Sequence, residues 1–198
     1  MIAAIVLAAG RSQRMGRPKM ILPWGETTVI GRVEQVLKQS AIDEILVVTG
    51  GHHSEVELAL RSTVARTIFN PDFANGEMAR SLQIGIEALP ENFEAALVVL
   101  GDQPQIELEV VRAVLAAYRQ HSAPLVVPSF QKRRGHPWLV TRDFWAEILQ
   151  ISPPATLRDF LNRHLSETCF VEALTPSVLL DLDTPTDYQR YRPASEGS

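Results

Sequence analysis

The feature that most constrains the fold of this chain is a succession of short, almost wholly apolar segments separated by helical patterns. The apolar segments, each predicted to be a strand, are Ile2–Leu7, Ile45–Thr49, Ala96–Leu100, Leu125–Pro128 and Val178–Leu182. Between them, apolar residues recur at helical spacing over 29–37, 78–89 and 108–118. Strands that are apolar on both faces are typical of parallel sheets covered by helices on both sides. The pattern therefore predicts βαβ units and an α/β fold, a three-layer sandwich with a mostly parallel central sheet.

The segment 129–173 departs from this rhythm. It contains a Gly-His-Pro turn, a predicted strand at Trp138–Val140 and helical patterns at Phe144–Leu149 and Thr156–Arg163. The total length of 198 residues suits one compact domain. We therefore expect a single domain over 1–192, with 129–173 as an insertion beside the site and 193–198 as a frayed tail.

Composition excludes several classes of protein. The formal net charge of −4 argues against a general nucleic-acid binder. Cys169 is the single cysteine, so neither an internal disulfide nor a cysteine-rich metal site can form. No apolar stretch is long enough to cross a bilayer, and the short apolar run at 2–9 has no basic residue before it, unlike a signal peptide. We expect a cytoplasmic protein that binds neither nucleic acid nor membrane.

The loop after the first strand is cationic. Residues 1–25 contain no Asp or Glu, yet Arg11, Arg14, Arg17 and Lys19 fall within nine positions. The loop matches neither the P-loop nor the dinucleotide-binding fingerprint. Arg14 and Lys19 suit a triphosphate whose charge must be neutralised as pyrophosphate departs. The alternative is an ordinary strand–helix connection with solvent-exposed charges.

Other polar residues follow the predicted strands directly. In an open α/β sheet, ligands bind beyond the carboxyl ends of the strands. Asp102 and Asp183 each follow a predicted strand, which makes both candidate magnesium ligands, because Mg²⁺ takes few protein carboxylates and fills its remaining positions with phosphate and water. The alternative for each is a helix N-cap. A second basic cluster, 132–134, precedes the Gly-His-Pro turn.

Five motifs together resemble one family. They are the loop 7–19 continued through 20–25 and 28–30; Asn70-Pro71 with Gly76, Met78, Ser81 and Leu82; Gly101-Asp102-Gln103-Pro104; Gly135-His136-Pro137; and Asp181-Leu182-Asp183-Thr184-Pro185. In order and spacing they resemble the nucleotidyltransferase superfamily of sugar-nucleotide pyrophosphorylases and molybdenum cofactor nucleotidyltransferases. Within it, the chain is most similar to the molybdenum cofactor cytidylyltransferase group. The resemblance covers nearly the whole chain and implies a Rossmann-like nucleotidyltransferase fold.

The resemblance also implies roles for individual residues. Arg14 and Lys19 would bind the β- and γ-phosphates, Asp102 and Asp183 would hold Mg²⁺, and His136 would hold the acceptor. The implied nucleotide-binding residues are Leu7, Ala8, Ala9, Gly10, Arg14, Lys19, Gly51, Gly76 and Ser81. Ser81 can equally be a small residue in helix packing, and Arg80 replaces the small residue that the family often has before it.

The implied reaction is magnesium-dependent transfer of CMP from CTP to molybdopterin, giving molybdopterin cytosine dinucleotide and pyrophosphate. A recipient molybdoenzyme or its chaperone is an implied partner. CTP is favoured over GTP because guanylyl-transferring relatives tend to read Leu-Ala-Gly-Gly, whereas Ala9 places a Cβ near the base. Two alternatives remain open: a sugar- or polyol-phosphate pyrophosphorylase, and a non-catalytic carrier or insertion factor. Retention of Lys19, Asp102 and Asp183 argues against the carrier.

Overall fold

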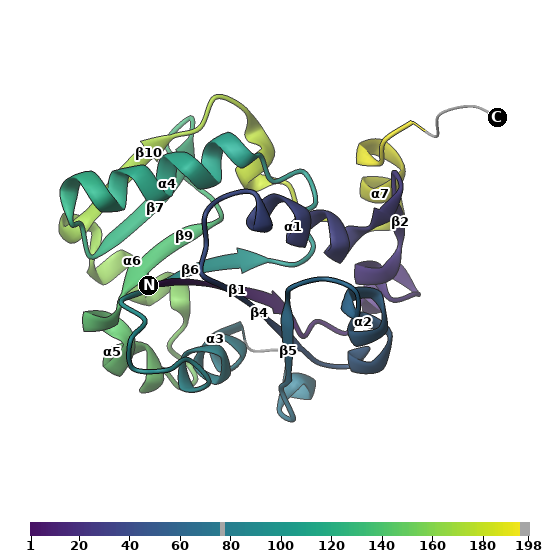
Figure 1. Ribbon diagram of the computed structural model, residues 1–198, viewed down its shortest axis with the longest axis horizontal. Helices are drawn as coiled ribbons and strands as arrows, with labels where there is room; N and C mark the ends of the chain where they lie inside the picture. The colour runs from purple at the N-terminus through teal and green to yellow at the C-terminus, as the bar shows by residue number, and fades with distance from the viewer. Residues whose placement is uncertain (76–77, 195–198) are drawn as a thin grey trace.

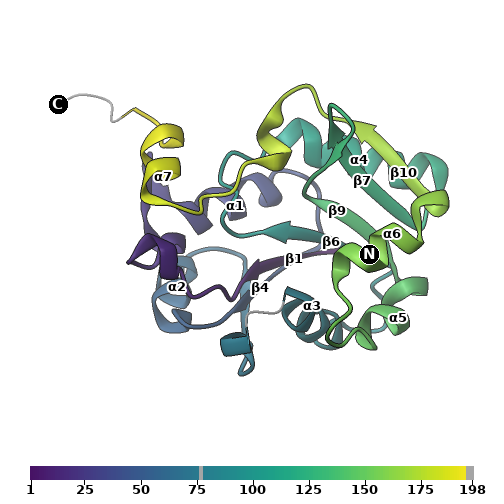
Figure 2. The same ribbon diagram turned by 180° about the vertical axis from the view of Figure 1, so that it is seen from behind.

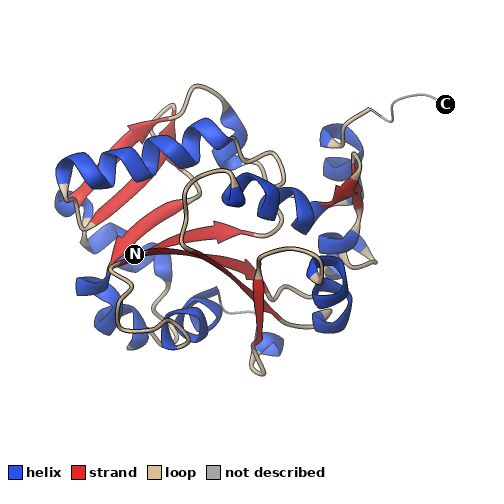
Figure 3. Cartoon of the chain, in the orientation of Figure 1, coloured by secondary structure: helices blue, strands red, loops and turns tan. Residues whose placement is uncertain are grey.

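The computed structural model describes residues 1–75 and 78–194 and is built on one mixed, eight-stranded sheet (Figures 1 and 3). The strand order is β10-β7-β9-β6-β1-β4-β5, with β8 paired to β7. The sheet strands are β1 (Ile2–Ala8), β4 (Glu44–Thr49), β5 (Arg66–Phe69), β6 (Ala95–Leu100), β7 (Leu125–Phe130), β8 (Arg133–Arg134), β9 (Trp138–Thr141) and β10 (Thr168–Glu172). Strands β9 and β8 run antiparallel to their neighbours, and the other pairings are parallel. A separate two-stranded hairpin joins β2 (Pro23–Trp24) and β3 (Thr27–Thr28).

Helices cover both faces of the sheet, as Figures 1 and 2 show from opposite sides. One face carries α1 (Val29–Lys38), α2 (His53–Leu60) and α4 (Leu108–His121). The other carries α3 (Met78–Glu87), α5 (Trp145–Leu149) and α6 (Leu157–Arg163). The short α7 (Pro185–Tyr191) packs on the β2–β3 hairpin. The predicted three-layer α/β sandwich with a mostly parallel sheet is therefore confirmed.

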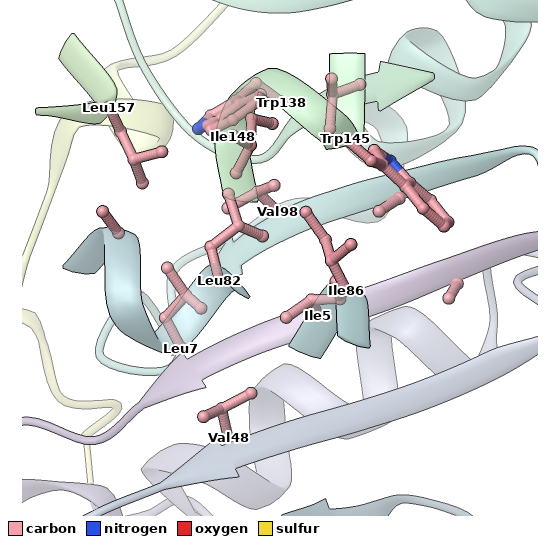
Figure 4. Packing of buried hydrophobic residues seen from close by; sticks show 14 of the residues in the cluster. Ile5, Leu7, Val48, Leu82, Ile86, Val98, Trp138, Trp145, Ile148 and Leu157 are labelled. Atoms are coloured by element: carbon pink, nitrogen blue, oxygen red, sulfur yellow. The ribbon is translucent and has the colours of Figure 1, made fainter. Parts of the chain in front are cut away.

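The two cores follow from the alternation of side chains along each strand. In β1, all of whose residues are buried, Ile5 and Leu7 pack beneath α3, whereas Val6 and Ala8 face the layer that contains α1. Figure 4 shows the first of these layers, where side chains of α3, α5 and α6 gather with those of the sheet. Because both faces are buried, β1 must be apolar throughout, which is why its sequence identifies it so clearly.

One predicted strand is wrong. Thr175 caps a 3₁₀ turn at Pro176–Leu179, where the predicted strand Val178–Leu182 was expected to begin. Proline at the first turn position favours this start. The extended residues that follow the turn do not pair with a strand of the sheet that the structure describes. Instead, the backbone N–H of Leu182 donates to the carbonyl oxygen of Asp102 in the loop after β6 (3.1 Å). Asp183 therefore follows an extended connection rather than a strand.

The remaining predicted strands and helices are present, with bounds shifted by a few residues at most. The segment 129–173, expected as an insertion beside the site, supplies β9 and β10 to the central sheet itself. Gly76 and residues 195–198 of the expected tail lie outside the described residues. Within the described ranges, no helix is long and apolar enough to cross a membrane.

Candidate functional site

A cavity of about 240 Å³ opens beyond the carboxyl ends of β1 and β6. Its lining comes from five parts of the chain: Leu7, Ala9 and Gly10; Lys19 and Met20; Phe73, Met78 and Ser81; Leu100 and Asp102; Asp181 and Asp183. Most predicted nucleotide-site residues therefore meet here. A second, more open cavity lined by Arg11, Arg14 and Ala74 adjoins it, because both share Gly10, Lys19, Phe73 and Asp183.

The cationic loop is folded back on itself by local hydrogen bonds. Ser12 adopts a left-handed conformation (φ 52°), and its carbonyl accepts from the N–H of Met15 (3.0 Å). The hydroxyl of Ser12 accepts from the N–H of Lys19 (3.1 Å). Met15 is buried against Leu182 and Tyr188, so the loop is anchored at its middle as well. This folding directs Lys19 inward, where its side chain is only 11% exposed.

The backbone of Ala9 is held by a close approach from the end of β4. A Cβ added to Gly50 would lie 2.3 Å from the carbonyl oxygen of Ala9, so only glycine fits there. Phe73 packs beside the same glycine and against Gly51. Gly51 was expected to contact base or ribose, but Phe73 rather than Gly51 lines the cavity.

Lysine and two aspartates form the charged centre of the cavity. The ammonium of Lys19 forms an ion pair with the carboxylate of Asp102, and it lies 3.6 Å from Oδ1 of Asp183. The guanidinium of Arg14 lies 3.1 Å from Oδ2 of Asp183, with 71% of the arginine side chain exposed. All four predicted phosphate- and metal-binding side chains thus belong to one cluster.

Neither aspartate caps a helix. The N-cap of α7 is Thr184, which forms a reciprocal capping box with Asp187, and α4 begins after Glu107. The N-cap alternatives for Asp102 and Asp183 are therefore wrong. The partners of both carboxylates are instead the cationic side chains of Lys19 and Arg14.

A third carboxylate, Asp181, lies beside this cluster. It is the first residue of the motif 181–185, and the sequence predicted no role for it. Its Oδ1 accepts from Nε2 of Gln103 (2.6 Å). Burial raises the pKa of Asp181, and the neighbouring carboxylates of Asp102 and Asp183 raise it further, against the opposing effects of Gln103 and Lys19. The carboxyl group therefore holds a proton to higher pH than an ordinary aspartate.

The donor set fits a divalent cation. Lys19 already places a positive charge between Asp102 and Asp183, and hard divalent ions prefer such carboxylate oxygens. No group of three or more His, Cys, Asp or Glu side chains is preformed as a metal centre in the described parts of the chain. Asp102 and Asp183 could supply two carboxylate ligands to a divalent ion, with phosphate oxygens and water as the others.

Of the other residues predicted to bind the nucleotide, Ser81 lines the cavity and the side chain of Ala8 does not. Ser81, 4% exposed, lines the cavity, and its hydroxyl accepts from Nδ2 of Asn70 (3.0 Å), which orients it. Ser81 thus serves helix packing and faces the cavity as well. The side chain of Ala8 points to the opposite face of the sheet, so only its backbone belongs to this edge.

His136 lies outside this cavity and lines another, of about 560 Å³, beside it. The backbone N–H of His136 donates to the carbonyl oxygen of Val178 (3.0 Å). Gly135 fits so closely that an added Cβ would lie 2.2 Å from the same oxygen. Burial lowers the pKa of His136 to about 4, so the imidazole is neutral at pH 7. Met78 lines both cavities and links them.

Phe73 and Asp181 were not predicted to line the site. Phe73 sits in the 3₁₀ turn η3 (Phe73–Asn75), which the Asn70 side chain helps to fix by accepting from the N–H of Asp72 (2.8 Å). An aromatic residue shortly after Asn70-Pro71 was the available signal for Phe73. For Asp181, the signal was its spacing of two from Asp183 in an extended segment.

Comparison with known proteins agrees with this geometry. The E. coli (strain K12) molybdenum cofactor cytidylyltransferase is 29% identical over 190 residues, covering 94% of this chain and 93% of that protein. The molybdenum cofactor guanylyltransferase of Mesorhizobium japonicum is 27% identical over 197 residues, covering 94% and 92%. Among solved structures, Rv0371c of Mycobacterium tuberculosis H37Rv superposes with a TM-score of 0.80 at 28% identity, covering 96% of this chain and 95% of that one. A complex of Rv0371c with manganese superposes with a TM-score of 0.76 at 25% identity, covering 96% of each chain.

The family model described as the MobA-like NTP transferase domain matches residues 4–168, which contain most of β1, the cationic loop and Asp102. Transfer of a nucleotidyl group from a nucleoside triphosphate is therefore the class of reaction to which this site belongs. With its Rossmann-like three-layer fold and the cluster of Lys19, Asp102 and Asp183, the chain belongs to the MobA-like NTP transferase family.

Proposed function

We propose that this protein transfers CMP from CTP to molybdopterin, releasing pyrophosphate. The observation that carries the proposal is the cluster of Lys19, Asp102 and Asp183 inside a cavity walled by the loop after β1. Similarity over more than nine-tenths of the chain to a molybdenum cofactor cytidylyltransferase supports the choice of acceptor. Ala9, which lines the cavity and carries a methyl group that glycine lacks, supports the choice of a pyrimidine over a purine.

In the proposed reaction, a phosphate oxygen of the acceptor attacks the α-phosphorus of CTP. The bond from that phosphorus to the oxygen bridging the β-phosphate breaks, and pyrophosphate leaves with the bonding electrons. The nucleophile is already an anion, so no strong general base is needed. Positioning and charge neutralisation supply most of the rate, as in other phosphoryl-type transfers.

The chain's own residues have distinct tasks in this scheme. Asp102 and Asp183 would hold Mg²⁺, which supplies charge neutralisation on the triphosphate when bound. When the nucleotide enters, Lys19 exchanges its carboxylate partners for phosphate oxygens. The exposed Arg14 likewise leaves Asp183 and binds the phosphates. Ser81, held by Asn70, and the backbone of Ala9, held by Gly50, position the nucleoside. His136, as a neutral imidazole, hydrogen-bonds the acceptor in the adjoining cavity.

The test is a pyrophosphate-release assay with Mg²⁺, each of CTP, GTP and ATP, and either molybdopterin or a sugar phosphate as acceptor. Product mass identifies what was joined. We expect pyrophosphate and molybdopterin cytosine dinucleotide from the CTP and molybdopterin pair. Turnover with a sugar phosphate alone would replace this proposal by a pyrophosphorylase, and binding without turnover would replace it by a carrier.

A further inference from the structure

The cavity that contains His136 is strongly cationic. Lys132, Arg133, Arg134 and Arg158 line it, and none of the lining residues that the structure describes is a carboxylate. This concentration of like charge stands in a chain whose formal net charge is −4. Like charges gathered in a concave site repel one another and raise the local concentration of anions. The cavity is therefore suited to a negatively charged group.

Arg134 is fixed in place with an unused donor. It belongs to β8, and its Nη2 donates to Oδ1 of Asn162 on α6 (2.5 Å). Its Nη1 is buried and has no hydrogen-bond partner in the described parts of the chain. A buried N–H without a partner is destabilising, and a ligand oxygen would relieve that cost. A guanidinium held at one nitrogen and unsatisfied at another is a preorganised anion binder.

Arg158 approaches the same cavity from α6. The start of this helix is fixed by a capping box in which Thr156 and Asp159 bond reciprocally. Because Asn162 lies on the same helix, the contact between Arg134 and Asn162 also fixes α6 against β8. Two guanidinium groups on elements that are tied together thus face one cavity. Leu157 and Leu161 line the same cavity and add apolar surface to it.

The position of these charges indicates which end of the acceptor they meet. In the proposed function, on which this inference rests, the nucleophilic phosphate must reach the α-phosphorus in the Lys19 cavity. Met78 lines both cavities, so an acceptor that spans them passes Met78 and leaves its other end among the arginines. His136 adds no positive charge there, since it is neutral at pH 7.

We infer that the acceptor carries a second anionic group, remote from the phosphate that it uses as nucleophile, and that Arg134 and Arg158 bind this group. They are specificity-determining residues for the acceptor and do not contact the nucleotide. An acceptor with one phosphate and no second anion would leave Nη1 of Arg134 unsatisfied. The protein should discriminate against it for that reason.

The experiment compares two probes that differ by one anionic group, phenyl phosphate and 4-carboxyphenyl phosphate. Each is titrated calorimetrically into the full chain saturated with Mg²⁺ and α,β-methylene-CTP. We expect the wild type to bind 4-carboxyphenyl phosphate about tenfold more tightly, as charge-assisted hydrogen bonds warrant. Arg134→Met and Arg158→Met should each remove most of that preference. Arg119→Met, on an exposed part of α4 at the opposite face of the sheet, is the matched control and should retain it.

The outcomes separate the alternatives. If both probes weaken equally in the arginine variants, the two residues bind the nucleophilic phosphate and the inference is overturned. Equal binding of the two probes to the wild type also overturns it. Arg158 is exposed, so its variant is informative even if Arg134→Met unfolds. A separate titration with Mg²⁺ and the CTP analogue alone tests the proposed function. If the analogue does not bind, the proposed function is wrong, whatever the two probes show.

Discussion

The backbone N–H of Leu182 donates to the carbonyl oxygen of Asp102 across a distance of 3.1 Å. Leu182 is fully buried beside Met15 and Tyr188, so the segment that carries Asp181 and Asp183 is anchored on its apolar side. The hydrogen bond sets this segment against the loop after β6. Asp102 and Asp183, which are distant in the chain, are thereby brought to the same lysine, Lys19.

We predict that Asp102→Asn and Asp183→Asn both reduce turnover by about 10²–10³, the range seen when one electrostatic group is removed from an active site. Asp183 is included because Thr184, not Asp183, caps α7, so its substitution does not remove a helix cap. Pyrophosphate release at saturating Mg²⁺ measures the effect, and urea unfolding checks that the fold survives. Rates within a few-fold of wild type for either variant would contradict its role as a metal ligand.

Lys19→Met should have opposite effects on metal binding and on turnover. Without nucleotide, the lysine ammonium neutralises Asp102 and Asp183, so its removal should tighten Mn²⁺ binding by about tenfold or more. Turnover should fall by about 10²–10³ because the leaving pyrophosphate loses a cation. Electron paramagnetic resonance of Mn²⁺ gives the affinity and the pyrophosphate assay gives the rate. Unchanged or weaker Mn²⁺ binding would show that the lysine does not compete with the metal; Lys38→Met, at the exposed end of α1, is the control.

The choice of base should depend on Ala9. Ala9 lines the cavity, and Gly50 packed against its carbonyl prevents the backbone from withdrawing. Ala9→Gly should therefore raise use of GTP relative to CTP, by roughly five- to tenfold, since a methyl in a pocket contributes about 1 kcal/mol to discrimination. Competition between the two nucleotides, analysed by product mass, gives the ratio. A wild type that already prefers GTP would disprove the cytidylyl assignment and leave the nucleotidyltransferase class intact.

His164 should make stability depend on pH. Its Nε2 lies 2.8 Å from Oε2 of Glu147, and its Nδ1 contacts Glu167. Burial lowers the pKa of His164, but the hydrogen bonds to Glu167 and Glu147 outweigh this and raise it above 6.5. The folded state then holds the proton more tightly than the unfolded state. The stabilisation is complete below pH 6.5 and is lost as the pH rises through the folded-state pKa.

Urea unfolding of wild type and His164→Gln at pH 5.5 and pH 9 measures this contribution. The difference in unfolding free energy between the two proteins should be larger at pH 5.5. Glu147 also pairs with Arg163 (2.7 Å), so some interaction with this carboxylate persists in the variant. An equal difference at both pH values would mean that protonation of His164 does not stabilise the fold.

The parts of the fold that the sequence predicted are those buried on both faces. Strands β1, β4 and β6 are apolar because helices cover both sides, whereas the edge strands β5 and β10 are partly exposed and include Arg66 and Glu172. Those two strands and α2 were not predicted. The segment Val178–Leu182 was wrongly predicted to be a strand because it is apolar. The side chains of Val178 and Leu182 are buried, but they belong to a 3₁₀ turn and an extended connection.

The candidate site was predicted as a set of residues but not as an arrangement. The placement of Arg14, Lys19, Asp102 and Asp183 after predicted strands indicated an anion and metal site, and the structure brings these side chains together. The pairing of Lys19 with Asp102, 83 positions apart, depends on which strands are neighbours, and no local pattern encodes that. The resemblance implied that Gly51 binds the nucleotide, but the ring of Phe73 packs against Gly51 and lines the cavity in its place.

Strand β9 runs against β6 and β7, so its first residue, Trp138, rather than its last, stands nearest the carboxyl end of β6. The β7–β8 hairpin and the turn 135–137 come directly before β9, so they adjoin the end of β9 at which Trp138 stands. These turns form no part of β1, β6 or the loop that β1 carries, and Gly135 is the residue among them that its close fit against Val178 fixes. Under the proposed function, acceptor recognition is therefore separable from nucleotide chemistry, and grafting 130–137 between relatives with Gly135 retained is an engineering route that this topology opens.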